Sequence, residues 1–135
     1  MNMNQVQNEV LYIEDDEINL ALMRHIFLKK LPSLKLIEAT TARQGIEIAK
    51  ERKLSLILLD IGLPDQDGFT ALKEIKSWMV QEPTPIWAVS ASVFESDIKN
   101  GLNSGFEKYI TKPYDIQKIV KLIKNTVMVG TINTN

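Results

Sequence analysis

The sequence predicts a doubly wound α/β fold, in which five parallel strands form one sheet and helices cover both of its faces. Two observations predict this fold. Short apolar runs alternate with longer amphipathic segments, and the alternation repeats five times along the chain. Three of the apolar runs are continuous, as expected for strands that are buried on both faces of a parallel sheet. The connections between successive strands should be right-handed.

The apolar runs are the expected strands. Residues 10–13, 56–59 and 86–89 are apolar throughout, which is typical of central strands. Residues 34–37 alternate between apolar and polar side chains, which favours an edge strand. The pair 109–110 is the shortest run and is expected to form the fifth strand.

The amphipathic segments between these runs are the expected helices, with ends marked by capping residues and helix breakers. They cover residues 18–30, 41–52, 68–80, 95–104 and 115–128. The first helix should end before Pro32, and the fourth should end at Gly105, a residue that favours helix C-termini. Thr40 or Thr41 is the candidate N-terminal cap of the second helix, and Asp115 is that of the fifth.

The composition fits one domain, which we expect over residues 9–128, with polar tails at 1–8 and 129–135. The net charge of −1 gives no basic excess for direct binding to nucleic acid. With no cysteine and one histidine, the chain cannot form disulfides, thiolate nucleophiles or multi-histidine metal sites. No signal peptide is recognisable and no apolar run approaches the ~20 residues of a membrane span, so we expect a cytoplasmic protein without membrane contact.

Polar side chains follow the strands at one predicted edge of the sheet, where ligands bind in doubly wound folds. They are Glu14 to Glu17 after the first strand, Asp60 after the third, Ser90 after the fourth and Lys112 after the fifth. Each has another interpretation: the acids could favour a helix N-terminus, and Asp60 could begin a turn. Ser90 could be a cap, and Lys112 a solvated surface residue. Their placement at corresponding strand ends favours a shared site.

These side chains suit phosphoryl transfer. Carboxylates that lie close together repel one another and favour a divalent cation, and an all-oxygen ligand set favours Mg²⁺. Asp60 is a candidate nucleophile that would attack phosphorus and form an acyl phosphate. The Ser90 hydroxyl and the Lys112 ammonium could hold the other phosphoryl oxygens. Gly62 has no side chain, which leaves its carbonyl open to a metal.

The sequence resembles the receiver domains of two-component response regulators over roughly residues 9–128. Four segments carry the resemblance, in the order and spacing of the family: residues 10–19, 56–69, 84–91 and 105–113. The resemblance implies the flavodoxin-like strand order 2-1-3-4-5. It also implies that Asp60 accepts a phosphoryl group from a phosphohistidine. Such a domain is a signalling switch and no enzyme in the usual sense, because it catalyses only its own phosphorylation and dephosphorylation.

The resemblance implies roles for single residues as well. Glu14 and Asp15 would be the acidic pair around Mg²⁺, with Asp60 and the Gly62 carbonyl as further ligands. Lys112 would contact the phosphoryl group. The first acid of the pair departs from the commoner pattern of the family, which has Asp where this chain has Glu14.

Two further residues would form the switch of such a domain. Ser90 would be its hydroxyl residue, at a place where Thr is frequent in the family. Tyr109 would be its aromatic residue, which turns inward when Ser90 engages the phosphoryl group. The peptide bond between Lys112 and Pro113 is expected to be cis, as in the family.

The implied partners are a sensor histidine kinase or a histidine phosphotransfer protein, and a downstream protein that the sequence does not identify. Ile18, Leu20 and Met23 are candidate docking residues, because the first predicted helix carries more apolar side chains than its core stripe requires. Packing against the last helix is the other interpretation of these residues.

Three other functions share parts of the pattern. A phosphatase of the haloacid dehalogenase type needs a second Asp two residues after the nucleophile, where this chain has Gly62. A binding-only pseudo-receiver usually lacks the acceptor or the lysine, and both Asp60 and Lys112 are present. A flavodoxin-like electron carrier needs a Ser, Thr and Gly-rich loop after the first strand, where this chain has four acids that would repel phosphate.

Overall fold

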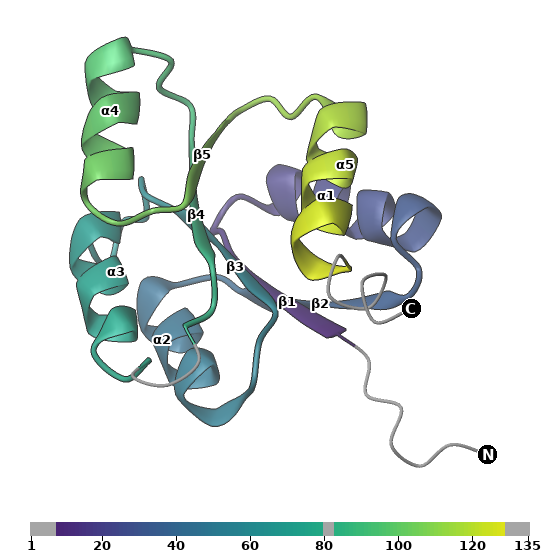
Figure 1. Cartoon of the computed structure of the whole chain (residues 1–135), viewed down its shortest axis with the longest axis horizontal. Helices are drawn as coiled ribbons and strands as arrows, with labels where there is room; N and C mark the ends of the chain where they lie inside the picture. The colour runs from purple at the N-terminus through teal and green to yellow at the C-terminus, as the bar shows by residue number, and fades with distance from the viewer. Residues whose placement is uncertain (1–7, 80–82, 129–135) are drawn as a thin grey trace.

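A computed structural model describes residues 8–79 and 83–128 of the chain. Within these residues, five strands form one parallel sheet and five helices lie against its faces (Figure 1). The strands are β1 (Asn8–Ile13), β2 (Leu34–Ala39), β3 (Leu56–Asp60), β4 (Ile86–Ser90) and β5 (Lys108–Thr111). The helices are α1 (Glu17–Lys30), α2 (Ala42–Glu51), α3 (Gly68–Lys76), α4 (Glu95–Asn103) and α5 (Ile116–Val127).

The strand order is β2-β1-β3-β4-β5, and each neighbouring pair is parallel. The predicted fold class and strand order are therefore confirmed. β3 lies at the centre of the sheet and all five of its residues are buried, which explains why its sequence is apolar until it reaches Asp60. The alternating strand β2 lies at an edge, as its pattern predicted.

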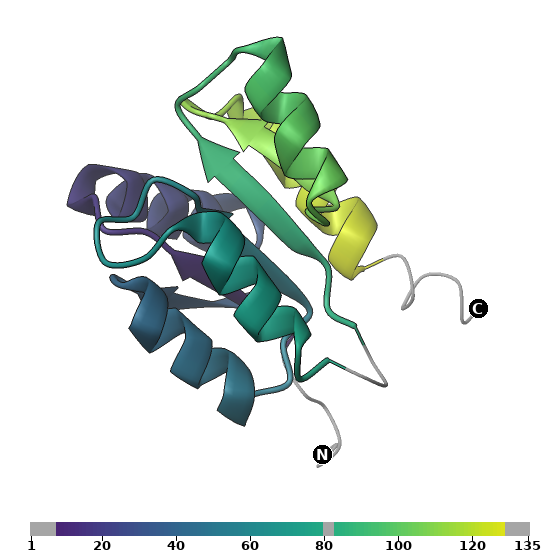
Figure 2. The same ribbon diagram turned by 90° about the vertical axis from the view of Figure 1, so that its left-hand side faces the viewer.

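The two faces of the sheet carry two separate hydrophobic cores. Helices α1 and α5 cover one face, while α2, α3 and α4 cover the other. In Figure 2 the face that carries α2, α3 and α4 is turned towards the viewer. Successive side chains of a strand point to opposite faces, so β1 contributes to both cores. Val10 and Tyr12 pack into the core beneath α1 and α5, whereas Leu11 and Ile13 pack beneath α2 and α3.

The helix ends follow local hydrogen bonds. Thr41 caps α2 and Asp115 caps α5, as predicted: each side chain accepts a bond from an amide in the first turn. The third helix is shorter than expected. Ser77 Oγ donates to the Glu74 carbonyl at 2.6 Å, and the Trp78 amide bonds to the carbonyl three residues before it, so the regular helical pattern stops.

Some expectations lie outside the described residues. The expected tails do so except for residue 8, which begins β1. Residue 80, the expected end of the third helix, lies outside as well. In the part of the chain that the structure describes, none of the helices has the length and apolar character that crossing a membrane requires.

Two of the three predicted docking residues belong to the core. Leu20 and Met23 are 1% and 0% exposed and pack beneath α1, so neither can contact a partner, and their assignment to a docking surface is wrong. Both residues lie on the stripe of α1 that faces the sheet, so their apolar side chains belong to the core and are not part of an outer surface. Ile18, at the start of the same helix, is 78% exposed.

Candidate functional site

The predicted site residues meet at the carboxyl edge of the sheet. Glu14 directly follows β1, while Asp60 and Ser90 are the last residues of β3 and β4. Lys112 directly follows β5. A pocket of about 430 Å³ opens at this edge, and Asp60, Ser90 and Lys112 contribute to its lining, as does Tyr109.

Three carboxylates form one cluster beside this pocket. Glu14, Asp15 and Asp60 each place a carboxylate oxygen within 4.8 Å of the others. Glu14 and Asp60 are buried, while Asp15 is exposed. Because the three side chains offer only oxygen donors and carry like charges, the donor set fits a hard divalent cation. This acidic group could therefore hold a metal ion, as the sequence predicted.

Lys112 supplies the positive charge that the buried carboxylates face. Its Nζ lies 2.6 Å from Glu14 Oε1 and 3.0 Å from Asp60 Oδ2. Burial lowers the pKa of Lys112, but the two carboxylates outweigh this effect, so its pKa lies above the ordinary value. The ammonium is therefore charged and directed at the atoms where the predicted chemistry takes place.

Glu14 is completely buried, yet both of its oxygens have hydrogen-bond donors. Oε1 accepts from the Tyr12 hydroxyl at 2.9 Å as well as from Lys112, and Oε2 accepts from the Asp16 amide at 3.1 Å. Burial, with help from the neighbouring Asp60 carboxylate, raises the pKa of Glu14 to about 7, while Lys112 and the Asp16 amide act in the opposite direction. A proton and a cation would therefore compete for the Glu14 carboxylate near neutral pH, if a cation binds there.

Asp60 is oriented through both of its oxygens. Oδ1 accepts a bond from the Gly62 amide at 2.8 Å, and Oδ2 contacts Lys112. Gly62 leaves space here, because a Cβ at this position would lie 3.4 Å from Asp60 Oδ1. The loop is also tied to α2, since the two oxygens of Asp65 accept bonds from the amides of Ala42 and Arg43 at 2.9 and 3.1 Å.

The two predicted switch residues both contact Ser92. Ser90 Oγ accepts a bond from the Ser92 amide at 3.1 Å, and the Tyr109 hydroxyl donates to the Ser92 carbonyl at 3.3 Å. The Tyr109 ring lies against Gly101 of α4, where a Cβ would come within 2.9 Å of Tyr109 Cδ2. The peptide bond between Lys112 and Pro113 is cis, as expected.

Sequence reasoning missed two tyrosines behind the site. Tyr12 donates to Glu14, and its hydroxyl is hydrogen-bonded to that of Tyr114. One signal was available: residues two apart on a strand point to the same face, so a tyrosine two positions before a buried acid can reach it. Nothing in the sequence indicated Tyr114, which follows Tyr12 by 102 residues. Asp16, the third of the four acids that begin at Glu14, caps α1 with its side chain.

Comparisons with known proteins agree on one family. The sequence model of the response regulator receiver domain matches residues 10–124. Among characterised relatives, the sensor histidine kinase CheAY of Helicobacter pylori is 33% identical over 120 residues. That match covers 87% of this chain and only 15% of the kinase, so the chain corresponds to a small part of that relative.

Solved structures show the same architecture. The complex of the Saccharomyces cerevisiae histidine phosphotransfer protein Ypd1 with the receiver domain of Ssk1 matches with a TM-score of 0.83 at 28% identity, over 93% of this chain and 94% of that chain. The receiver domain of the Pseudomonas aeruginosa sensor histidine kinase PA1611, solved with a magnesium ion in its active-site cleft, matches with a TM-score of 0.79 at 23% identity. This second match covers 90% of this chain and 98% of that chain.

Proposed function

The chain belongs to the response regulator receiver domains, the phosphoacceptor modules of two-component signalling, and we propose that Asp60 is the residue that accepts the phosphoryl group. One observation carries the proposal. The Asp60 carboxylate lines the pocket with Lys112 Nζ at 3.0 Å from one oxygen and the Gly62 amide at 2.8 Å from the other. Among the three clustered carboxylates, all of which the structure describes, Asp60 alone lines the pocket. Glu14 is fully buried, and Asp15 is exposed.

In the proposed reaction, a carboxylate oxygen of Asp60 attacks the phosphorus atom of a phosphohistidine. The new bond joins oxygen and phosphorus, the nitrogen–phosphorus bond breaks, and its electron pair returns to the imidazole of the donor. The product is an acyl phosphate. Lys112 would stabilise the negative charge of the phosphoryl oxygens, because its ammonium already lies beside Asp60 and stays charged.

Glu14, Asp15, Asp60 and the carbonyl of Gly62 would hold Mg²⁺. The donor set supports this assignment, because three carboxylates gather within 4.8 Å while Lys112 balances only part of their charge. When bound, the ion would offset the charge of the carboxylates and of the incoming phosphoryl group. The magnesium ion in the cleft of the PA1611 receiver domain is consistent with the assignment.

Ser90 and Tyr109 would convert phosphorylation into a change of surface. Ser90 Oγ accepts its hydrogen bond from the Ser92 amide, so its own proton is available for a phosphoryl oxygen. The hydroxyl of Tyr109 is bonded to the Ser92 carbonyl, so a shift of Ser90 towards the phosphoryl group would disturb the contact that holds Tyr109. The domain would then act as a switch that catalyses only its own phosphorylation and dephosphorylation.

The proposed donor is a sensor histidine kinase or a histidine phosphotransfer protein, and the exchange would take place in the cytoplasm. Ypd1 is such a phosphotransfer protein, and it is bound to a receiver domain in the yeast complex. Ile18 is the remaining candidate for a docking contact, since it is 78% exposed and follows Asp15 of the acidic pair by three residues, near the start of α1. A downstream protein target, or onward relay of the phosphate, would complete the pathway.

Phosphoramidate tests this proposal without a protein partner, because it contains the phosphorus–nitrogen bond of a phosphohistidine. With Mg²⁺ present, the chain should gain one phosphoryl group in its intact mass. Lys112→Ala should slow the gain by about 100-fold, the loss typical when one charge-stabilising group is removed. A chain that gains no mass, or that gains it equally fast without Lys112, would contradict the assigned site.

A further inference from the structure

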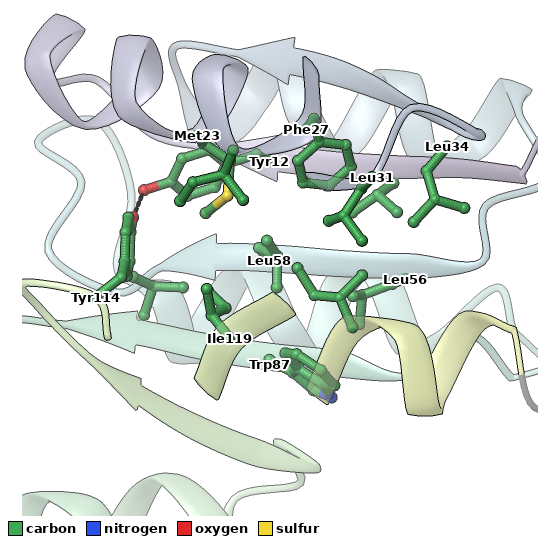
Figure 3. Close-up of a cluster of buried hydrophobic side chains, with 14 of the residues drawn as sticks. Tyr12, Met23, Phe27, Leu31, Leu34, Leu56, Leu58, Trp87, Tyr114 and Ile119 are labelled. Atoms are coloured by element: carbon green, nitrogen blue, oxygen red, sulfur yellow. Dashed lines mark hydrogen bonds between the residues drawn. The ribbon is translucent and has the colours of Figure 1, made fainter. Parts of the chain in front are cut away.

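Two buried tyrosines form a hydrogen-bonded chain that ends on Glu14. Tyr12 lies in β1, and Tyr114 lies in the segment between β5 and α5. Figure 3 shows their hydroxyl groups pointing towards each other and joined by a hydrogen bond. The two rings meet edge to face, with centroids 6.4 Å apart. Tyr12 is fully buried and Tyr114 is 8% exposed, so neither hydroxyl has ready access to solvent.

The direction of this chain follows from the number of protons. Tyr12 donates its hydroxyl proton to Glu14 Oε1 at 2.9 Å. A hydroxyl has only one proton to donate, so in its bond with Tyr114 the Tyr12 oxygen must be the acceptor. Tyr114 therefore donates to Tyr12, and Tyr12 donates to Glu14. Hydrogen bonds in such a series polarise and strengthen one another in a buried environment.

The chain completes the set of contacts that fix the Glu14 carboxylate. Lys112 contacts the same oxygen as Tyr12, at 2.6 Å, and the Asp16 amide bonds the other oxygen at 3.1 Å. These donors come from three segments: Tyr12 from β1, Lys112 from the segment after β5, and the Asp16 amide from the N-cap of α1. A glutamate has one more rotatable bond than an aspartate, so it needs more contacts to keep one orientation. The tyrosine chain supplies one of them.

We propose that Tyr12 and Tyr114 are positioning residues that hold Glu14 in the orientation required of a divalent-cation ligand. The inference rests on the metal site of the proposed function, and it assigns to that site a supporting shell formed by this chain's own tyrosines. Neither tyrosine lines the pocket at Asp60. Their effect reaches the cation only through Glu14, as partners of metal-binding carboxylates act in general.

A role in core packing alone makes a different prediction. Both rings belong to the core beneath α1 and α5, where Phe27 and Ile119 are neighbours in the same cluster. A Tyr→Phe substitution keeps the ring and removes only the hydroxyl. If the tyrosines merely filled space, these substitutions would change stability and leave the affinity for cations unchanged. If they position Glu14, the affinity should change even in a fully folded variant.

The test is an NMR titration of the ¹⁵N-labelled full chain with MgCl₂, without a phosphoryl donor, following the Gly62 amide beside Asp60. Tyr12→Phe should weaken Mg²⁺ binding by about ten-fold, the lower end of the effect for partners of metal ligands. Tyr114→Phe should weaken it by less, because Tyr12 keeps its bond to Glu14. The double variant should match Tyr12→Phe alone, since Tyr114 reaches Glu14 only through Tyr12.

Two further variants separate positioning from packing. In a Glu14→Asp background the carboxylate is one methylene shorter and no longer reaches the Tyr12 hydroxyl. Removing that hydroxyl by Tyr12→Phe should then change Mg²⁺ affinity by less than about two-fold. Phe27→Leu is the matched core control: it should lower the unfolding temperature without changing Mg²⁺ affinity.

The inference is overturned if Tyr12→Phe and Tyr114→Phe, each with a folded spectrum, bind Mg²⁺ within about two-fold of wild type. It is also overturned if Tyr12→Phe weakens binding equally in the Glu14→Asp background. If the wild type does not bind Mg²⁺, both the metal site of the proposed function and the role of the tyrosines are contradicted. If the wild type binds Mg²⁺ and the tyrosine variants bind it with the same affinity, only the role of the tyrosines is contradicted.

Discussion

Glu14 and Lys112 form a buried ion pair, in which Glu14 Oε1 lies 2.6 Å from Lys112 Nζ. The same ammonium also contacts Asp60 at 3.0 Å, so one cation faces two buried carboxylates, with the exposed Asp15 carboxylate close by. Because the positive charge is insufficient, the site stores like-charge repulsion that a divalent cation would relieve.

Asp60→Asn should make the ion-free protein more stable, by about 1–2 kcal/mol, because it removes one of the mutually repelling charges at a functional site. Lys112 keeps Glu14 as its partner in the variant. Urea unfolding in EDTA measures the difference. Added Mg²⁺ should stabilise the wild type more than the variant, since a ligand stabilises the state that binds it. A variant that is less stable than wild type in EDTA would argue against charge repulsion at the site.

Mg²⁺ affinity should fall as the pH drops below about 7, the value to which burial and the Asp60 carboxylate raise the pKa of Glu14. Below this pH, Glu14 holds a proton that a metal ion must displace, so the apparent affinity decreases by at most about ten-fold per pH unit. Titrations at several pH values test this. Glu14→Gln is the control, because its weaker affinity should lack this pH dependence. A wild-type affinity that stays constant through neutral pH would contradict the assignment of Glu14 as a ligand.

Gly62, in the loop after Asp60, and Gly68, the first residue of α3, should respond differently to alanine. A Cβ at Gly68 would lie 2.6 Å from the backbone Cα of Ile61, whereas a Cβ at Gly62 would meet nothing closer than 3.4 Å. Gly68→Ala should therefore destabilise the fold by about 1–3 kcal/mol through overpacking, while Gly62→Ala should change stability much less. Thermal unfolding of the two variants measures the contrast. Equal effects would mean that the close approach of Gly68 to Ile61 is unimportant.

The proposed docking role of Ile18 predicts a difference between phosphoryl donors. Ile18→Ala should slow transfer from a phosphorylated phosphotransfer protein by about ten-fold, in the range for truncating an interface anchor, and leave transfer from acetyl phosphate unchanged. Phosphorylated Ypd1 is a suitable probe, because it binds a structurally similar receiver domain. Leu28→Ala is the matched control, since Leu28 is also exposed, at 71%, but lies at the opposite end of α1. Equal slowing by both variants would exclude a specific contact at Ile18.

Much of the fold and most of the site could be predicted from local patterns. The apolar runs at residues 10–13, 56–59 and 86–89 marked the central strands, because both faces of those strands are buried. Asp60 and Lys112 were identifiable as site residues because each stands at the carboxyl end of a predicted strand, and parallel strands bring these ends together.

What could not be predicted depends on contacts between distant segments. For Leu20 and Met23 the sequence left docking and core packing both open, and the structure shows that they pack beneath α1 against the sheet. Tyr12 and Tyr114 meet only because β1 and the segment after β5 lie close together in the folded chain, a relationship that no local pattern encodes. The early end of α3 was likewise hidden, because the Ser77 hydroxyl competes locally for a helix carbonyl.

The most direct test of the central claim is the intact mass of wild type and Asp60→Asn after incubation with Mg²⁺ and acetyl phosphate. Wild type should gain one phosphoryl group in an acid-stable, base-labile form, as an acyl phosphate requires, and Asp60→Asn should gain none. An equal gain by both proteins would move the acceptor to another residue. If neither protein gains mass, Asp60 does not accept a phosphoryl group from a small donor, and the proposed chemistry of this site is contradicted.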